Sequence, residues 1–218
     1  DSKDPFNCLY STIHEVGHAC YEQNVSTDFL HSPLGSGVSL GIHESQSRIF
    51  ENQIGRSRYF TKWLFKKMKN CFGEFGIEDA EEFYRLVNKV ETGFIRTEAD
   101  EVHYNLHIML RFELEVEVIA KNLEVEDLPD AWNRKFKDYF GRDVKKPSDG
   151  ILQDVHWSIG AFGYFPTYTL GNLNAGCLFE KMKKDIPNMD ESFEKGDVSS
   201  ATTWLTENIH QHGLSLIH

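Results

Sequence analysis

The sequence predicts an all-α, mainly helical fold, and the spacing of its apolar residues carries this prediction. Apolar residues recur at intervals of three and four in segment after segment of the 218-residue chain. Residues 113–119 alternate between acidic and apolar, which would favour a strand, but the flanking helical period is stronger. The one β element that we predict is a small hairpin around residues 30–40, in a stretch rich in glycine and serine ahead of the second helix.

The first predicted helix has a start signal and an apolar face. Asp4 can cap it, and Pro5 suits the first helical position because a missing N–H costs nothing there. Its apolar stripe consists of residues three or four apart: Leu9, Ile13, Val16 and Cys20. One side of this helix should therefore be buried.

The same periodicity predicts six further helices, within what we interpret as a single helical catalytic region over residues 1–218. They cover residues 41–70, 79–91, 98–122, 129–140, 168–185 and 200–211. Gly73 and Gly76 end the first of these six, and residues 141–150 form a polar loop. The chain contains no internal repeat and no low-complexity region.

Composition and charge argue against several classes of protein. The net charge is −11 without any basic run, which argues against nucleic acid or an anionic membrane as a partner. No apolar stretch is long enough to span a bilayer, and no signal peptide opens the chain. The 4 cysteines form no C-x-x-C pair, which favours reduced thiols and a cytoplasmic protein.

The motif H-E-V-G-H, residues 14–18, says most about function. His14 and His18 are four residues apart, so both imidazoles lie on one helix face and can bind one metal ion. Glu15 lies one position round the helix, where it can activate a water bound to that metal. Together these residues form the zincin arrangement for hydrolysing peptide bonds. The alternative interpretation is a pair of surface histidines.

A zincin needs a third protein ligand, and the next predicted helix offers three candidates. They are His43, Glu44 and Glu51. Glu44 and Glu51 are seven residues apart and share a helix face, so periodicity does not choose between them. The alternative for either glutamate is an ordinary solvated charge.

A second histidine pair, His103 and His107, has the same spacing of four. It lacks the intervening glutamate, and no third ligand of obvious register follows it. Asp100 and Glu101 lie close by in the sequence, which would suit a pH-sensitive or supporting role. We interpret this pair as structural rather than metal-binding.

Four motifs in order make the sequence recognisable: H-E-V-G-H (14–18), H-E-S-Q-S-R (43–48), I-R-T-E-A-D (95–100) and G-I-L-Q (150–153). With the run D-V-H-W-S-I-G-A-F-G-Y-F-P-T-Y that follows, the chain closely resembles the Taq-type metallocarboxypeptidases over almost its whole length. The resemblance implies an all-helical fold and one divalent metal ion, with zinc favoured over cobalt or manganese. It also implies peptide substrates with a free C-terminus, cleaved one residue at a time with broad specificity, and a homodimer.

The resemblance further implies roles for individual residues. Glu44 would be the third metal ligand. Arg96 would bind the C-terminal carboxylate of the substrate, because a guanidinium offers a planar pair of donors. The alternative for Arg96 is a salt bridge to Glu98 or Asp100.

Four residues nearer the C-terminus complete the predicted site. His156, Tyr164 and Tyr168 are candidate catalytic donors to the oxyanion of the tetrahedral intermediate, because related helical zincins carry a histidine followed by tyrosines. The alternative for the tyrosines is a place in the core. Gln153 is interpreted as a substrate-positioning residue, with a loop hydrogen bond as the alternative.

The sequence also departs from the family pattern. Family members are usually much longer and carry H-P-F and D-x-R-x-T motifs upstream, and neither motif occurs here. We therefore interpret the chain as a C-terminal portion that lacks the family's N-terminal half and last helices. Two other functions stay open: a metal-binding fragment without activity, and a helical zincin endopeptidase that would not need Arg96.

Overall fold

The computed structural model describes residues 5–215, and Asp4, the predicted first cap, lies outside this range. The regular structure of the described residues is entirely helical, which confirms the predicted all-α fold. The chain divides into two compact units, one formed by residues 1–89 and 170–218 and the other by residues 90–169. The single catalytic region over residues 1–218 stays a prediction.

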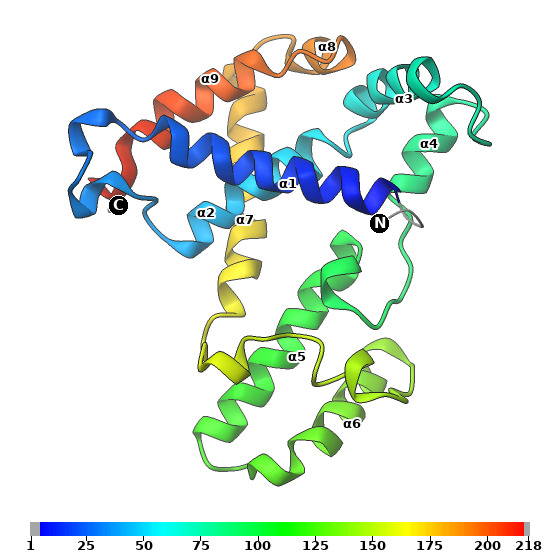
Figure 1. The fold of residues 1–218 in the computed structure, drawn as a ribbon, viewed down its shortest axis with the longest axis vertical. Coiled ribbons are helices and arrows are strands. Elements are labelled where there is room, and N and C mark those ends of the chain that lie inside the picture. The colour runs from blue at the N-terminus through cyan, green and yellow to red at the C-terminus, as the bar shows by residue number, and fades with distance from the viewer. Residues whose placement is uncertain (1–4, 216–218) are drawn as a thin grey trace. The chain divides into compact units, whose positions relative to one another are not determined.

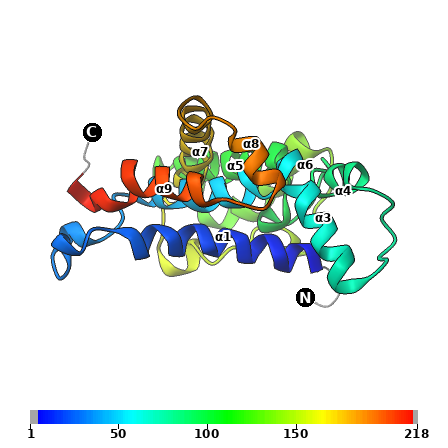
Figure 2. The same ribbon diagram turned by 90° about the horizontal axis from the view of Figure 1, so that it is seen from above.

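The first unit contains the N-terminal and C-terminal helices (Figure 1). Its helices are α1 (Pro5–Asn24), α2 (Leu40–Arg48), α3 (Arg58–Phe72), α4 (Ala80–Val87), α8 (Met189–Glu194), α9 (Ser199–Asn208) and, from Leu170 onward, α7 (Pro166–Asp185). Two views show α9 running beside α1 (Figures 1 and 2). A 3₁₀ turn, His210–Ser215, follows α9.

Two clusters of buried side chains form the core of this unit. One joins the segment after α2 to α7, α8 and α9: Ile49, Phe50, Ile54, Ala175, Phe179, Met182, Met189, Phe193, Ala201 and Leu205. The other joins α1 to α3 and α4: Tyr10, Leu64, Phe65, Ile77, Phe83 and Val87. The helix that carries H-E-V-G-H is thus fixed on a packed core.

The second unit is built on two helices, α5 (Glu101–Ile119) and α6 (Leu128–Phe140). They pack side by side and run in roughly opposite directions (Figure 1). Four 3₁₀ turns complete it: Arg96–Glu98, Val125–Asp127, Pro147–Asp149 and Trp157–Ile159. Its buried apolar residues are Leu110, Leu114, Trp132, Phe136 and Phe140, with a smaller group of Tyr104, Ile108 and Phe165.

Side-chain caps explain where several predicted helices begin. The Asp100 carboxylate accepts the backbone N–H groups of Val102 and His103, which have no partner inside the first turn of α5. Asp79 accepts the N–H of Glu82 in the same way and starts α4. Both helices therefore begin close to their predicted positions.

The predicted continuous helix over residues 41–70 is wrong. After α2 the chain forms a π-helical turn, Ile49–Ile54, and the helix then stops. Ser57 has an extended backbone, and its hydroxyl accepts the N–H of Phe60, which caps a new helix, α3. The apolar spacing of three and four continues across this break, because the segments on both sides of it bury an apolar face. The apolar pattern therefore contains no sign of the break.

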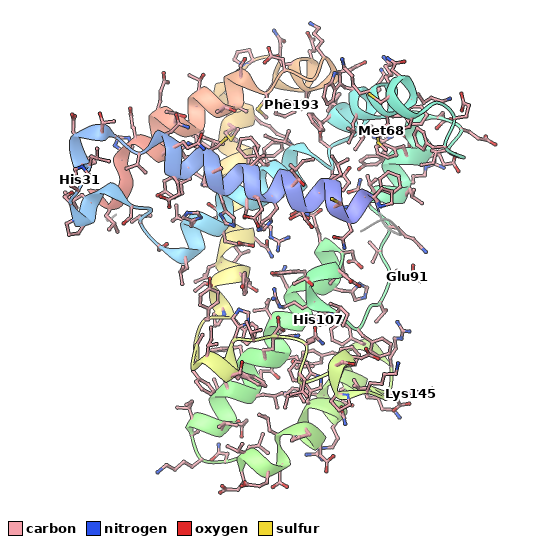
Figure 3. The ribbon with its side chains drawn as sticks, viewed as in Figure 1. His31, Met68, Glu91, His107, Lys145 and Phe193 are labelled. Carbon is pink, nitrogen blue, oxygen red and sulfur yellow. The ribbon has the colours of Figure 1, made fainter. Side chains whose placement is uncertain are left out.

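The predicted β-hairpin at residues 30–40 is also wrong. One 3₁₀ turn, Thr27–Phe29, directly precedes this range, and a second one, Pro33–Gly35, lies within it instead of a hairpin. His31, labelled in Figure 3, has a φ of 66°, a left-handed conformation that an extended strand does not accommodate. Ser32 caps the second turn, and Pro33 has no N–H to give to a strand ladder.

Two smaller differences concern helix faces and lengths. Val16, predicted to be buried, is 45% exposed, and the buried residues of α1 are Tyr10, Gly17 and Tyr21. Helix α8 was not predicted, because six residues are too few for a periodic signal.

Across residues 5–215, none of the helices has the length and apolar character that crossing a bilayer demands.

Candidate metal centre

Helix α1 presents the two histidines of H-E-V-G-H on one face. The rings of His14 and His18 meet edge to face with their centroids 4.9 Å apart. Their side chains are 18% and 24% exposed, as expected for residues at the border of a buried face. Glu15 lies beside them with an exposed side chain.

Two glycines allow other helices to approach this face. A Cβ on Gly17 would lie 2.6 Å from the carbonyl oxygen of Gln46, so α1 and α2 cross here in contact. A Cβ on Gly171 of α7 would lie 2.6 Å from the Cγ of Glu44. A larger residue at Gly17 would push α1 and α2 apart, because backbone atoms cannot give way at such distances. A larger residue at Gly171 would displace the side chain of Glu44.

The crossing brings the histidines to Glu44 of α2. The Glu44 Oε2 atom lies 3.7 Å from His14 Nε2 and 3.5 Å from His18 Nε2. Ligand atoms from the three residues all lie within 4.8 Å of one another, and residues 5–215 contain no second group of this kind. Two donors of a tetrahedral zinc ion are roughly 3.4 Å apart, so this spacing suits one bridging cation.

Glu44 is held ionised in this position. It is 7% exposed, and burial alone would raise the pKa of its carboxyl. The neighbouring His18, Arg48 and His14 outweigh that effect and lower the pKa of Glu44 to about 2. Arg48 Nε donates to Glu44 Oε1 at 2.9 Å, which leaves Oε2 for the histidines.

The other two candidate ligands contact the far sides of the imidazole rings. Glu51 Oε2 lies 2.9 Å from His14 Nδ1 and also accepts from Arg48. His43 Nδ1 lies 2.6 Å from His18 Nδ1. Of the three candidates, Glu44 is the one whose carboxylate faces both Nε2 atoms, so the geometry favours it over Glu51, and its role as the third ligand stays a prediction.

The remaining predicted site residues all belong to the second unit. Arg96 is 5% exposed, and its alternative salt bridge to Glu98 or Asp100 is not the one found. Its guanidinium instead donates to Asp154 from Nη2, at 2.7 Å, and from Nε, at 3.0 Å. Its Nη1 donates to the Tyr104 hydroxyl at 2.8 Å.

Gln153 joins two loops of this unit through its amide. Its Oε1 accepts the backbone N–H of Arg96 at 2.8 Å, and its Nε2 donates to the carbonyl oxygens of Phe94 and Asp149. These are the loop hydrogen bonds that we considered as the alternative to a substrate contact. A direct substrate role for Gln153 stays a prediction.

His156, Tyr164 and Tyr168 do come together. His156 Nε2 lies 3.0 Å from the Tyr168 hydroxyl, and the ring of Tyr164 has its centroid 5.1 Å from that of His156. Burial lowers the pKa of His156, and the nearby arginines add to this effect against the opposing charge of Asp154. A neutral imidazole hydrogen-bonded to a phenol is able to pass or donate a proton.

The rival histidine pair is divided between two structural roles. His103 Nδ1 lies 2.8 Å from the Asp100 carboxylate that caps α5. His107, labelled in Figure 3, is fully buried, and its ring lies 4.5 Å from the ring of Phe140. Neither residue belongs to the candidate metal group found among residues 5–215.

Sequence reasoning missed Asp154, which organises the buried charges of the second unit. Arg111 is fully buried and donates from Nε to Asp154 Oδ2 at 2.7 Å, while Arg96 occupies Oδ1. Asp154 directly follows the G-I-L-Q motif, so its place in the sequence was visible. Its two partners come from positions 96 and 111, and only the folded chain brings them to it.

A helix-borne H-E-x-x-H pair that faces a glutamate from the next helix is the arrangement of helical metallopeptidases. The chain belongs to the family described as Carboxypeptidase Taq (M32) metallopeptidase, whose model matches residues 1–216. This match confirms the resemblance drawn from the four motifs.

Named relatives and solved structures agree with this assignment. The chain is 44% identical over 217 residues to Carboxypeptidase 1 of Bacillus subtilis, covering 98% of this chain and 43% of that protein. It is 45% identical over 212 residues to Thermostable carboxypeptidase 1 of Thermus thermophilus, covering 97% and 42%. The crystal structure of the M32 carboxypeptidase from Deinococcus radiodurans R1 is 46% identical with a TM-score of 0.91, covering 94% and 42%. The chain therefore spans less than half the length of the relatives that it matches.

Proposed function

We propose that this chain carries the metal-binding and water-activating part of a metal-dependent carboxypeptidase with broad specificity. The observation that supports this most is the convergence of His14 Nε2, His18 Nε2 and Glu44 Oε2 on one point. The names of the relatives, which are carboxypeptidases, supply the reaction and the peptide substrates.

The donor set fits one divalent cation, and we propose zinc before cobalt or manganese. Two imidazole nitrogens and one carboxylate are the ligands of many catalytic zinc sites, and three protein ligands leave a position for substrate or water. When bound, the ion would supply a Lewis acid that polarises the scissile carbonyl and acidifies water. His14, His18 and Glu44 would hold it.

Glu15 is the proposed general base. It lies next to His14 on α1, and its exposed side chain is free to approach a substrate. We propose that its carboxylate takes a proton from the attacking water and then gives it to the leaving amine. Replacing the carboxylate by an amide would remove this proton transfer and keep the metal ligands.

The residues of the second unit are proposed to serve substrate recognition and charge stabilisation. Arg96 would bind the C-terminal carboxylate of the peptide, and Gln153 would position the substrate through its amide. His156, Tyr164 and Tyr168 would donate to the developing oxyanion, which the hydrogen bond between His156 and Tyr168 supports. Arg96 already donates to Asp154 and Tyr104, so a substrate carboxylate would share its donors.

A peptide assay with metal analysis tests this function. The chain is loaded with zinc, its bound metal is measured, and it is offered one peptide with a free C-terminus and the same peptide amidated. Cleavage of the free form alone, lost in Glu15→Gln with the metal retained, supports the carboxypeptidase. Cleavage of both peptides would indicate an endopeptidase instead.

A metal-binding fragment without activity is the second candidate, because the chain covers only 43% of the Bacillus subtilis relative. It would bind zinc and cleave neither peptide. We also propose that the chain forms a homodimer and that it is cytoplasmic. Free thiols at all four cysteines fit a cytoplasmic location. Sedimentation of the purified chain measures its oligomeric state.

A further inference from the structure

The two histidines of the candidate metal centre are supported in different ways on their Nδ1 sides. His14 Nδ1 meets the carboxylate of Glu51 directly, at 2.9 Å. His18 Nδ1 meets a second imidazole, that of His43, at 2.6 Å. His43 comes from α2, one residue before Glu44, so the same helix turn supplies a candidate ligand and this contact.

The contact continues to a third residue. His43 Nε2 lies 2.7 Å from the Oε1 atom of Glu22, which is near the end of α1. An ionised carboxylate only accepts hydrogen bonds, so His43 Nε2 is the donor. In a neutral imidazole the other nitrogen is then an acceptor, and His18 Nδ1 must donate to it.

This order has a direct consequence for metal binding. With its proton on Nδ1, His18 keeps a lone pair on Nε2, the atom that lies 3.5 Å from Glu44 Oε2. The opposite tautomer would carry a proton on Nε2 and could not bind a cation there. The row Glu22–His43–His18 therefore selects the tautomer that a metal ligand needs.

The ring of His43 is packed as well as hydrogen-bonded. Its centroid lies 5.3 Å from that of Tyr21, whose hydroxyl accepts the N–H of Val38 at 3.1 Å. A Cβ on Gly37 would lie 3.0 Å from His43 Cδ2 and 3.1 Å from the Tyr21 ring. The loop ahead of α2 thus closes on this imidazole and restricts its rotation.

We propose that His43 is a positioning residue that fixes the tautomer and orientation of His18, with Glu22 setting the direction of the hydrogen bonds. This inference rests on the proposed function, because it concerns a metal held by His14, His18 and Glu44. Partners on the outer side of metal ligands typically change metal affinity by about 10–100-fold when removed.

Metal affinity of the purified chain provides the first test. Zn²⁺ and Co²⁺ affinities are measured by competition with a chromophoric chelator. His43→Ala should weaken both by about 10–100-fold, and His43→Gln should recover part of the loss because its amide oxygen can accept from His18 Nδ1. Glu22→Ala should weaken binding less, since this residue acts through His43.

The matched control is His31→Asn. His31 is an exposed histidine of the same unit in the left-handed conformation, which asparagine also tolerates. Its replacement should leave metal affinity unchanged. Circular dichroism of every variant verifies that the helices are intact.

The tautomer itself provides the second test, without any metal. Long-range ¹H–¹⁵N spectra of the histidine rings at pH 8 should show His18 with its proton on Nδ1. In His43→Ala this signal should move toward the Nε2–H form. If a folded His43→Ala variant keeps the Nδ1–H tautomer of His18 and a metal affinity within twofold of the unchanged chain, this inference is overturned. The proposed metal site would still stand. An unchanged chain that binds neither metal would overturn the proposed metal site and this inference together.

Discussion

Two carboxylates beside arginine and histidine, the buried Glu44 in the first unit and the partly buried Asp154 in the second, are used differently. Asp154 accepts hydrogen bonds on both oxygens, from Arg96 Nη2 and from Arg111 Nε, each at 2.7 Å. Glu44 accepts one, from Arg48, on Oε1. Its Oε2 faces two imidazole nitrogens at 3.5 and 3.7 Å, beyond the usual range for an N–H···O bond.

The difference teaches how a structural ion pair can be told from a candidate metal site. Around Asp154, donors meet acceptors, and the oppositely charged groups stabilise one another. Around Glu44, the Nδ1 contacts of both histidines leave Nε2 lone pairs facing a carboxylate oxygen. Three acceptors that face one another repel, and a cation between them would remove this repulsion, which is why we propose a metal ion here.

We expect the largest effect on metal binding, and measuring it would sharpen this comparison. Glu44→Ala should weaken Zn²⁺ binding by more than about 100-fold, beyond the loss typical of outer partners, because it removes a ligand atom. Glu51→Ala should cost about 10–100-fold, because it removes only the partner of His14 Nδ1. Chelator competition measures both, and a larger loss in Glu51→Ala would reverse the assignment.

The same comparison predicts the opposite pattern for stability. Asp154→Ala would leave two buried arginines without their shared carboxylate and should cost about 3–5 kcal/mol of unfolding free energy. The folded Asp154→Ala variant should bind Zn²⁺ with nearly the same affinity as the unchanged chain. Urea unfolding followed by circular dichroism gives the free energy, and a loss below about 1 kcal/mol would mean that the bridge is not needed.

A smaller effect tests how the helices meet at the metal site. Gly17→Ala places a methyl group 2.6 Å from the Gln46 carbonyl oxygen and should destabilise the chain by about 1–3 kcal/mol. Zinc affinity should fall with it, because the crossing of α1 and α2 sets the distance to Glu44.

Gly176→Ala is the control for that substitution. Gly176 also lies inside a helix, α7, and a Cβ there has no neighbour within 4 Å. This change should be neutral or stabilise by up to about 1 kcal/mol, as expected for replacing a helical glycine. Equal melting temperatures for the two variants would contradict the close crossing at Gly17.

The smallest effect concerns pH. Burial, with a further contribution from the charge of Arg111, lowers the pKa of His107 to about 3. The unfolded chain, with a pKa near 6.5, binds the proton more readily, so stability should fall as the pH drops below about 6.5. His107→Leu should reduce this slope by up to about 1.4 kcal/mol per pH unit. Urea unfolding of the metal-free chain between pH 7 and pH 5 measures it, and an unchanged slope would exclude His107 as its source.

How much the sequence could predict depends on the distance over which each feature is determined. The helix starts at Asp79 and Asp100 are local, because the cap and the groups it binds lie within three residues. The spacing of His14 and His18 is local too. Which of Glu44 and Glu51 faces both Nε2 atoms is not determined locally, because it depends on where α2 crosses α1.

The failures follow the same rule. The hairpin was expected from composition alone, and the left-handed His31 that prevents it leaves no periodic signal. The arginine partners of Asp154 were missed because they lie 58 and 43 residues away along the chain. Gln153 joins segments just as far apart, since Phe94 lies 59 residues away, so its loop contacts could be considered from the sequence but not located.

In the π-helical turn at Ile49–Ile54 each backbone hydrogen bond spans one more residue than in an α-helix, i→i+5 instead of i→i+4. Removing one residue there would return the segment to α-helical phase and rotate Glu51 by about 100° away from His14. Glu44, which precedes the turn, would keep its place. The winding of this one turn therefore sets the carboxylate that contacts His14 Nδ1 independently of the three candidate ligands.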